Sequence, residues 1–441
     1  MKNILQFLST FIIYFVCVFQ LKAQSFSPSN IPRSARYDDV SFVNNNIGYT
    51  SVRGFIYKST DGGNNWTYIS KLDTSSTFRT YSRSVDFIDE DTGFVGTLTV
   101  NTFKGGIFKT TDKGLTWKKV FEVSDLGEGV CGMDHYENML VGVGTYAGPA
   151  NLYISHDYGA TFITKDLSSL ASALVDCYIV NKDTFFITGS SDTATHERPL
   201  ILKTTDGGNS FQVVSMLNAV GGYVWKIYFR PDGNGLASVE NNFNDPSLYG
   251  YVLRTTDFGA TWQEHVVDTV GNFGGIILLD NDVAFTTEQH QYGMWKSTDG
   301  GVNWTKLAFS EDTTKAGNRM LLLDNGKIVI AGAYIYTSGS TTVGIQQQHS
   351  NIADYHTIKV TPNLVGKNVN EIKVELDAKV STFGVFEIYN LNGQVIYKDE
   401  VQTYDKGKHY LYIGVQNYSK GMYYAVWKTS EVFVQTKFVV Q

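Results

Sequence analysis

Short runs of alternating apolar and polar residues, separated by Gly, Asp and Asn, extend along most of the chain. A representative unit begins with VWKIYFRPDGNGLASVENN at 224–242 and continues with YGYVLRTTDFGATWQEH at 249–265. Alternation with a period of two is typical of strands with one buried face, and the residues between the runs indicate tight turns. The unit therefore predicts two strands joined by a turn, then a third strand, a second turn and a fourth strand.

The second turn of this unit carries a motif, S/T-x-D-x-G-x-x-aromatic, that occurs six times. Its aspartates are 51, 45, 49, 51 and 42 residues apart, and a repeat of about 40–50 residues with four strands per unit is typical of β-propellers. We expect the aspartate to accept hydrogen bonds from turn amides, the glycine to adopt a positive φ angle and the aromatic ring to pack inward. The aspartates to which we assign this structural role are Asp61, Asp112, Asp157, Asp206, Asp257 and Asp299.

The motif resembles the Asp-box, or BNR, repeat of β-propellers over roughly residues 36–347. A seventh unit, LLLDNGKIVIAGAYIYTSGSTTVGIQQQ at 321–348, has the expected strand order, but Gly339 replaces the aspartate and Thr341 the glycine. We favour seven blades with a degenerate last blade, and six blades are the alternative. The resemblance implies no single activity, because the family includes sialidases, xyloglucan-active glycosidases, sortilin-type receptors and photosystem assembly factors.

The N-terminal residues have the pattern of a secretory signal peptide. Lys2 precedes an apolar run from Ile4 to Phe19, and small residues end at Ala23. No later segment approaches the ~20 apolar residues of a transmembrane helix, so we expect none in the mature protein. Removal of residues 1–23 leaves 34 basic and 43 acidic side chains, a net charge of −9. This charge argues against nucleic acid as a partner.

Two cysteines, Cys131 and Cys177, remain in the predicted mature chain. They are too few to form a disulfide scaffold. Aligning MLVGVG at 139 with TFFITG at 184 places them near the axis on adjacent blades, with an offset of one residue. A disulfide is therefore one expectation, and side chains that are turned apart by the offset are the other.

After Gln348 the repeat ends and a different β pattern begins. Runs such as EIKVEL and GMYYAVWK predict a small antiparallel β-sandwich, and Asn392-Gly393 predicts a tight hairpin between 386–391 and 394–401. We therefore divide the chain into a signal peptide at 1–23, an Asp-box propeller at 24–350, a linker at 351–357 and a C-terminal domain at 358–441.

This C-terminal domain resembles the type A sorting domain of the type IX secretion system. The matching elements are Thr361-Pro362-Asn363, IYNLNGQVIY at 388–397, KGMYYAVW at 420–427 and KFVV at 437–440, whereas Leu364 stands where the family often has a second proline. The resemblance implies contact with the type IX machinery after Sec-dependent passage through the periplasm, followed by release or attachment at the outer cell surface. An adhesive sandwich that stays on the protein is the alternative.

In an up-and-down blade, the links between blades and the turns between second and third strands lie on the face opposite the Asp-box turns. Loops on this face carry aromatic and charged residues that suit contact with a sugar or a peptide. The candidate binding residues are Tyr146, His196, Glu197, Arg198, Phe243, His290 and Tyr292.

Two acids on the same face are candidates for catalysis. Aligning LASVE with AFTTE places Glu240 and Glu288 at corresponding ends of second strands, and carboxylates about 5–10 Å apart serve glycoside hydrolysis. However, Arg33 and Arg36 lack the arginine-isoleucine-proline order of sialidases, and the xyloglucan-active enzymes usually use two propellers. We therefore favour a non-catalytic propeller that binds a glycan or a protein, with a sialidase-like or xyloglucanase-like glycoside hydrolase as the alternative.

The sequence contains no motif for a metal or a cofactor. The eight histidines are dispersed, and there is no D-x-D-x-D-G loop, phosphate-binding glycine loop or nucleophile elbow. We expect neither a metal nor a cofactor.

Overall fold

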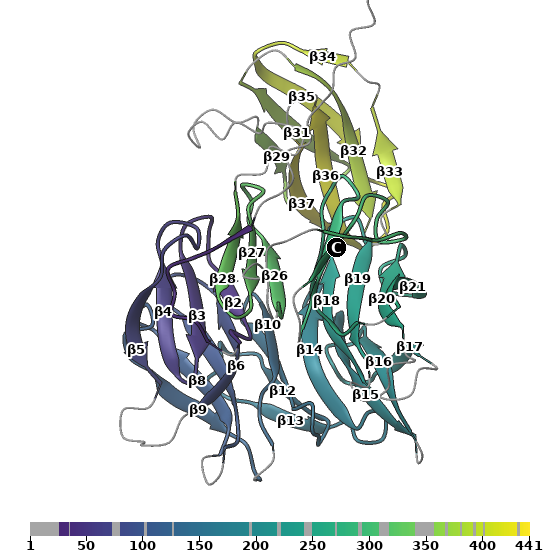
Figure 1. Ribbon diagram of the computed structural model, residues 1–441. Coiled ribbons are helices and arrows are strands. Elements are labelled where there is room, and N and C mark those ends of the chain that lie inside the picture. The colour runs from purple at the N-terminus through teal and green to yellow at the C-terminus, as the bar shows by residue number, and fades with distance from the viewer. Residues whose placement is uncertain are drawn as a thin grey trace, which may run out of the picture.

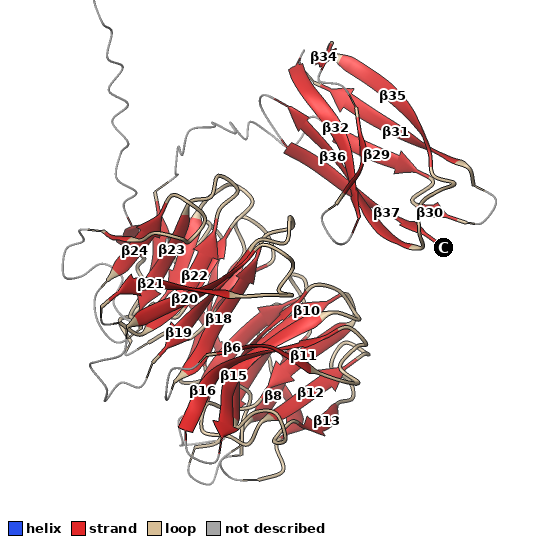
Figure 2. Cartoon of the chain, turned by 90° about the vertical axis from the view of Figure 1, so that its right-hand side faces the viewer, coloured by secondary structure: helices blue, strands red, loops and turns tan. Residues whose placement is uncertain are grey.

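The computed structural model of the chain describes residues 26–339 and 357–441. Gaps within these ranges fall at 35, 73–79, 101–103, 126–127, 194–195, 218–221, 242–248, 270, 290–292, 308–316, 367–368, 380–381, 391–393, 400–401 and 430–432. Strands are the regular elements of the described residues, and Figure 2 shows no helix among them. The expected signal peptide at 1–23 lies outside the described residues, as do residues 351–356 of the expected linker.

Seven four-stranded antiparallel sheets form the blades of a β-propeller (Figure 1). Blades one to three contain β2 (Val40–Phe42), β3 (Gly48–Val52), β4 (Phe55–Ser59) and β5 (Thr67–Lys71); β6 (Tyr81–Phe87), β7 (Gly93–Leu98), β8 (Gly106–Thr110) and β9 (Lys118–Glu122); and β10 (Gly132–Tyr136), β11 (Met139–Val143), β12 (Asn151–Ser155) and β13 (Ile163–Asp166). Blades four to six contain β14 (Ala173–Ile179), β15 (Phe185–Thr193), β16 (His196–Thr204) and β17 (Gln212–Met216); β18 (Tyr223–Phe229), β19 (Gly235–Glu240), β20 (Gly250–Thr255) and β21 (Gln263–Asp268); and β22 (Phe273–Leu278), β23 (Ala284–Glu288), β24 (Met294–Ser297) and β25 (Thr305–Lys306). The prediction of an all-β propeller with seven blades is confirmed.

The seventh blade joins the two ends of the propeller. It contains β26 (Arg319–Leu322), β27 (Ile328–Ala331) and β28 (Ile335–Ser338), and its fourth strand is β1 (Phe26–Pro28) from the start of the described chain. Phe26 is paired with Ser338 and packs edge-on against Phe285 of blade six, 6.2 Å between ring centroids. Sequence analysis did not anticipate β1, because a three-residue strand carries too little alternation to be recognised.

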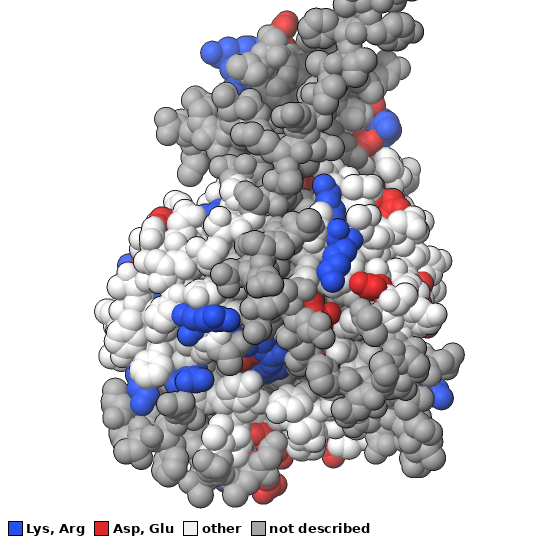
Figure 3. Space-filling model, viewed as in Figure 1, with Lys and Arg blue, Asp and Glu red and all other residues white. Residues whose placement is uncertain are grey.

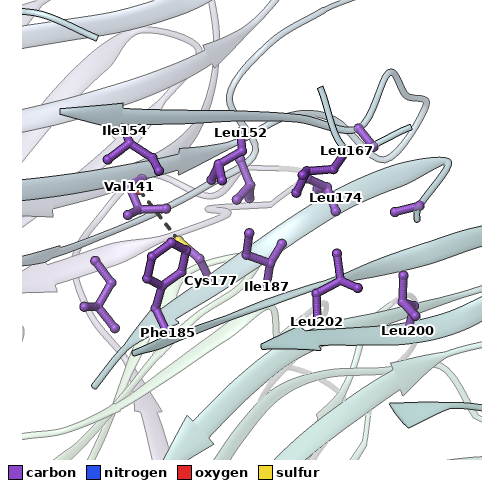
Figure 4. Packing of buried hydrophobic residues seen from close by; sticks show 14 of the residues in the cluster. Val141, Leu152, Ile154, Leu167, Leu174, Cys177, Phe185, Ile187, Leu200 and Leu202 are labelled. Carbon is purple, nitrogen blue, oxygen red and sulfur yellow. Dashed lines mark hydrogen bonds between the residues drawn. The ribbon is translucent and has the colours of Figure 1, made fainter. Parts of the chain in front are cut away.

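Apolar side chains fill the spaces between neighbouring blades. Figure 4 shows the cluster between blades three and four, where Leu152 of β12 and Leu202 of β16 are fully buried. Cys177 belongs to this cluster, with its Sγ 3.6 Å from the carbonyl oxygen of Val141, whereas Cys131 packs with other residues near Trp225. Both cysteines are free thiols, which agrees with the expectation that the offset turns them apart.

Two hydrogen bonds recur in all six copies of the repeated turn, one from the glycine amide to the Ser or Thr hydroxyl and one from the amide four residues after the aspartate to its Oδ1. In the first copy, Ser59 Oγ accepts a hydrogen bond from the Gly63 amide at 2.9 Å, and Asp61 Oδ1 accepts one from the Asn65 amide at 2.9 Å. Gly63 has a φ of 82°, which explains why glycine is required there. The Trp66 indole donates to the Gly63 carbonyl at 3.0 Å and is buried against the sheet. Each copy thus fixes the turn between the third and fourth strands of its blade.

The C-terminal β domain contains two sheets around one core. One sheet has the order β29 (Thr357–Thr361), β31 (Glu371–Ala378), β35 (Gly407–Gly414); the other has the order β30 (Leu364–Val365), β37 (Phe433–Val440), β36 (Gly421–Thr429), β32 (Thr382–Asn390), β33 (Val395–Lys398), with β34 (Gln402–Tyr404) on β32. The fully buried Trp427 lies in the core between them. Pairing is antiparallel, as expected, except between the two-residue strand β30 and β37, which are parallel. Residues 391–393 of the expected hairpin lie outside the described residues.

Candidate functional site

One face of the propeller collects the links between blades and the turns between second and third strands, because the chain reverses at every strand of a blade. We call it the loop face. The first strands of the blades begin there, and consecutive first strands lie next to one another from β2 to β26. Side chains near the start of these strands therefore converge where the central channel opens on the loop face.

A buried network of charges spans the channel. Arg319 Nε of β26 lies 2.9 Å from Asp39 Oδ1, and its Nη2 lies 2.7 Å from Asp176 Oδ1 of β14. Lys226 Nζ of β18 lies 3.2 Å from the same Asp176 oxygen. The four side chains are at most 15% exposed. These contacts connect blades one, four, five and seven. Because an unpaired buried charge is strongly destabilising, separating these blades would be costly.

Both burial and neighbouring charges shift the pKa values of this network. Burial raises the pKa of Asp39, and the positive charges of Arg319 and Lys226 oppose the rise. Burial also lowers the pKa of Lys226, with the Arg319 charge adding to the effect. For Arg319 burial acts to lower the pKa, but the Asp176 and Asp39 carboxylates outweigh it and raise it. The partners therefore outweigh burial at Arg319, whereas burial outweighs the partners at Asp39 and Lys226.

A second set of contacts surrounds Arg83 of β6. Its Nη1 lies 2.6 Å from Asp38 Oδ1, and the Arg36 Nε lies 2.5 Å from the same oxygen. Arg83 Nε and Nη2 both point to Cys131 Sγ at 3.4 Å. The Arg83 guanidinium also lies 5.2 Å from the ring centre of Trp225, within cation–π range. Arg83 is 2% exposed, so it supports this part of the channel from below the surface.

Aromatic side chains next to this set reach the surface. The rings of Tyr81 and Tyr146 lie 6.0 and 5.8 Å from the Arg83 guanidinium and are 36% and 42% exposed. The Tyr223 hydroxyl donates to the Tyr146 carbonyl at 2.7 Å, which holds the 145–151 loop close to blade five. Tyrosine offers a flat apolar face and a polar tip, a combination common where proteins bind sugars and peptides.

Polar side chains also accept hydrogen bonds from backbone amides at the inner edges of the blades, where no neighbouring strand is available. Asp39 Oδ2 accepts a hydrogen bond from the Val85 amide at 3.2 Å, and Asp134 Oδ2 accepts one from the Ile179 amide at 2.6 Å. In both cases an acid on a first strand, or directly before one, bonds the first strand of the next blade. Since buried amides without a partner are costly, these aspartates have a structural role.

One cluster farther along β6 and β10 has the composition of a metal site. His135 Nδ1 lies 2.7 Å from Asp86 Oδ2, and Asp134 contributes a third group within 4.8 Å. Burial acts to lower the His135 pKa, but the Asp86 charge outweighs it and raises the pKa to about 9. Burial and the Asp86 charge raise the pKa of Asp134 to about 7. The imidazole is thus engaged with a carboxylate, and an ion-pair cluster accounts for the arrangement.

The candidate binding residues have different positions. Tyr146 lies on the loop face, as described above. Arg198 lies in β16, on the long hairpin that β15 and β16 form, and is partly buried. His196 and Glu197 also lie in β16, opposite Thr193 and Asp192, but their side chains are outside the described part of the structure. The remaining candidates, Phe243, His290 and Tyr292, lie outside the described residues.

The two candidate acids end the second strands of neighbouring blades. Glu240 ends β19, where it is paired with Tyr223 and partly buried. Glu288 ends β23, is 6% exposed, and its carboxylate accepts a hydrogen bond from the Asn272 amide at 3.1 Å. The Glu288 carboxylate therefore holds the link between blades five and six.

A pocket of about 430 Å³ opens on the loop face beside blade one. One wall is the segment from β1 to β2, held to blade seven by bonds from the Ser34 amide to the Ala333 carbonyl and from the Tyr37 amide to the Gly332 carbonyl, at 3.0 and 2.6 Å. The other wall includes the turn between β3 and β4. The residues that line the pocket are Pro32, Arg33, Ser34, Tyr37, Val52, Arg53, Phe55 and Tyr57.

Sequence analysis missed the channel network and this pocket. A usable signal was present for the buried charges near the channel: Arg83 and Lys226 interrupt first strands, SRSVDF and VWKIYF, that are otherwise typical of buried strands. For the pocket, Arg33 was considered only as part of a sialidase motif. Arg33 and Arg53 line the same pocket because β1 pairs with β28 and completes the seventh blade.

The comparisons with known proteins support two parts of the chain separately. Residues 359–441 match the family model of the secretion system C-terminal sorting domain. A search of the curated proteins found no match to this sequence. Among the described residues no helix has the length and apolar character needed to cross a membrane.

Three solved structures resemble the chain in fold. YCF48 bound to a D1 peptide is 14% identical, with a TM-score of 0.55, over 72% of this chain and 97% of that one. A GH74 xyloglucanase from Xanthomonas campestris is 13% identical, with a TM-score of 0.57, over 80% of this chain and 59% of that one. The extracellular domain of a putative hybrid two-component system, BT4673, from B. thetaiotaomicron is 11% identical, with a TM-score of 0.51, over 95% and 59%. At these identities the likeness concerns the fold alone.

The matched C-terminal segment coincides with the small β domain that begins at β29. A domain of this kind implies contact with the secretion machinery and a destination outside the cell or on its surface. Residues 359–441 are a type IX secretion system sorting domain, and the described residues from β1 to β28 form a seven-bladed β-propeller.

Proposed function

We propose that this chain is a non-catalytic propeller that binds a glycan or a protein through its loop face after export by the type IX system. In this proposal residues 1–23 are a signal peptide for Sec-dependent passage. The six repeated turns are Asp boxes with a structural role, since their aspartates are engaged by turn amides and hydroxyls. The mature protein is either released or held at the outer surface.

One observation carries the binding proposal: at the loop-face mouth of the channel the acids are engaged and the aromatic rings are exposed. Asp38, Asp39 and Asp176 each lie within 3.0 Å of a guanidinium nitrogen. Tyr81 and Tyr146 present exposed rings beside them. Such a surface offers apolar and hydrogen-bonding contact, and these three described carboxylates are engaged in ion pairs rather than available for acid–base chemistry.

A glycoside hydrolase is the second candidate, favoured by the position of Glu240 and Glu288 at equivalent ends of β19 and β23. The likeness to a GH74 xyloglucanase agrees with this alternative at the level of fold. Against it, the buried Glu288 carboxylate already bonds the Asn272 amide. Removing Glu288 would then be expected to affect stability as well as any turnover.

A glycan array and a hydrolysis screen on the purified full chain distinguish the two functions. The binding proposal predicts retention of a ligand without turnover, and a loss of about tenfold or more in affinity for Tyr146→Ala. Tyr158→Ala, an exposed tyrosine on the opposite, repeated-turn face, serves as the matched control. Turnover that Glu240→Gln or Glu288→Gln abolishes, with the melting temperature unchanged, would replace the binding proposal by the hydrolase.

Export is tested separately in a host that has the type IX system. A chain truncated after Gln348 is expected to remain in the periplasm with its propeller folded, and a reporter fused to residues 351–441 is expected to reach the medium or the surface. A closed propeller does not depend on an appended sandwich for its core. Full-length levels of the truncated chain in the medium would favour a retained adhesive module.

A further inference from the structure

We propose that the pocket beside blade one binds a hexuronic acid unit of an acidic saccharide, with its carboxylate between Arg33 and Arg53. This inference rests on the proposed ligand-binding function of the loop face and names the ligand class for one part of it. The pocket volume of about 430 Å³ lies in the range of small-molecule sites. It suits a sugar-sized group rather than a folded surface.

The positive charge of the two arginines that line the pocket favours an anionic ligand. Arg33 and Arg53 are both exposed, and within the described residues neither guanidinium forms an ion pair. The described residues that line the pocket include no Asp or Glu. Guanidinium groups bind carboxylates through paired, charge-assisted hydrogen bonds. The buried arginines of the channel, by contrast, already have carboxylate partners.

The aromatic residues of the pocket suit a sugar ring. Phe55 is 38% exposed, and its ring lies 6.0 Å from that of Tyr68, which is 52% exposed. Tyr57 joins the same group at 6.0 Å from Tyr68. The C–H face of a pyranose can cover such rings while its carboxylate reaches the arginines. The Lys71 ammonium lies 5.7 Å from the centre of the Phe55 ring, which is still exposed enough for a sugar ring to pack on it. An acidic peptide side chain would satisfy the arginines without using the Phe55 ring, so the observations favour the saccharide.

Both walls are fixed before any ligand arrives. The Tyr37 hydroxyl donates to the Pro32 carbonyl at 2.7 Å. Arg53 and Gly54 form the two-residue turn between Val52 and Phe55, with φ angles of 52° and 77°. Both angles are those of a type I′ hairpin turn, in which the second residue is commonly glycine. A positive φ is unusual for arginine. The turn places Arg53 at the tip of a hydrogen-bonded hairpin, where it lines the pocket. Fixed walls reduce the ordering cost of binding.

Titration calorimetry of the full chain with a galacturonate oligosaccharide tests the inference. Binding is expected for the acid form and not for its fully methyl-esterified form, which has no carboxylate charge. Arg33→Gln and Arg53→Gln are each expected to weaken binding about tenfold or more. Arg53→Lys should lose less, because it keeps the charge. Phe55→Ala should also weaken binding, whereas Lys118→Gln, on the outer strand of blade two, should not. Melting temperatures verify that every variant is folded.

Two results would overturn the inference. Equal binding of the methyl ester, or wild-type affinity in folded Arg33→Gln and Arg53→Gln, excludes a carboxylate in this pocket. Binding of polyglutamate as tightly as the oligosaccharide, unaffected by Phe55→Ala, would assign the pocket to an acidic peptide. If the array finds a ligand whose binding depends on Tyr146 and not on the two arginines, the proposed function stands and this inference fails. If neither the glycan array nor the calorimetry finds a ligand, the result counts against both the proposed function and this inference.

Discussion

Replacing Asp176 by Asn tests whether the charge network holds the blades together. The Asp176 side chain is fully buried and receives Arg319 at 2.7 Å and Lys226 at 3.2 Å. Asparagine keeps the shape and removes the charge, which leaves the single carboxylate of Asp39 between two buried cations. Breaking a buried ion pair by removing one partner costs about 3–5 kcal/mol. We expect a loss of that size, because three hydrogen bonds from Lys226 and Arg319 nitrogens end on this one carboxylate.

Thermal and urea unfolding of the full chain measure the loss. For a propeller of this size, about 3–5 kcal/mol corresponds to a fall in melting temperature of about 5–10 °C. Asp183→Asn is the matched control, since Asp183 forms an exposed pair with Lys182 and such pairs contribute little. Adding Lys226→Met to Asp176→Asn should recover part of the loss, because one unpaired buried cation is then removed.

The reasoning fails if Asp176→Asn is no more destabilising than Asp183→Asn. It also fails if the double variant loses as much free energy of unfolding as Asp176→Asn and a single Lys226→Met variant lose together. Either result would mean that water or rearranged side chains neutralise the channel charges.

Three further predictions concern other parts of the propeller. Asp206→Ala should lower the melting temperature by less than Asp176→Asn and leave ligand affinity unchanged; equal melting with lost binding would contradict a structural turn. The His135 pKa of about 9 lies above its ordinary value, so its contribution to stability is complete below pH 6.5 and is lost as the pH rises through 9. Unfolding measured against pH should show this decline, and His135→Gln should remove it. Thiol titration without reductant should count Cys131 and Cys177 as free once the chain unfolds; a mass lower by two hydrogen atoms that a reductant restores would reveal a disulfide and disprove this.

Much of the fold was predictable because it depends on local repetition. The alternation in units such as 224–265 and the turns around Asp61 and its equivalents require only short-range hydrogen bonds and one buried face per strand. The loss of the aspartate at Gly339 did not prevent recognition of the seventh blade, since the strands β27 and β28 still follow one another in the order of the other units. The ends of the second strands at Glu240 and Glu288 were likewise placed by counting along the repeat.

The sequence by itself determined the blade pattern, the repeated turns and the similarity of the last 83 residues to a sorting domain. Tertiary structure alone decided which strand closes the ring and which charges meet on the axis. Asp39, Asp176 and Arg319 are far apart in the chain and meet only when seven blades share one axis. Arg33 and Arg53 share a pocket only because β1 pairs with β28 at the other end of the propeller. Long-range closure leaves no periodic trace in the sequence, since a single strand or a single charge is sufficient to make each contact.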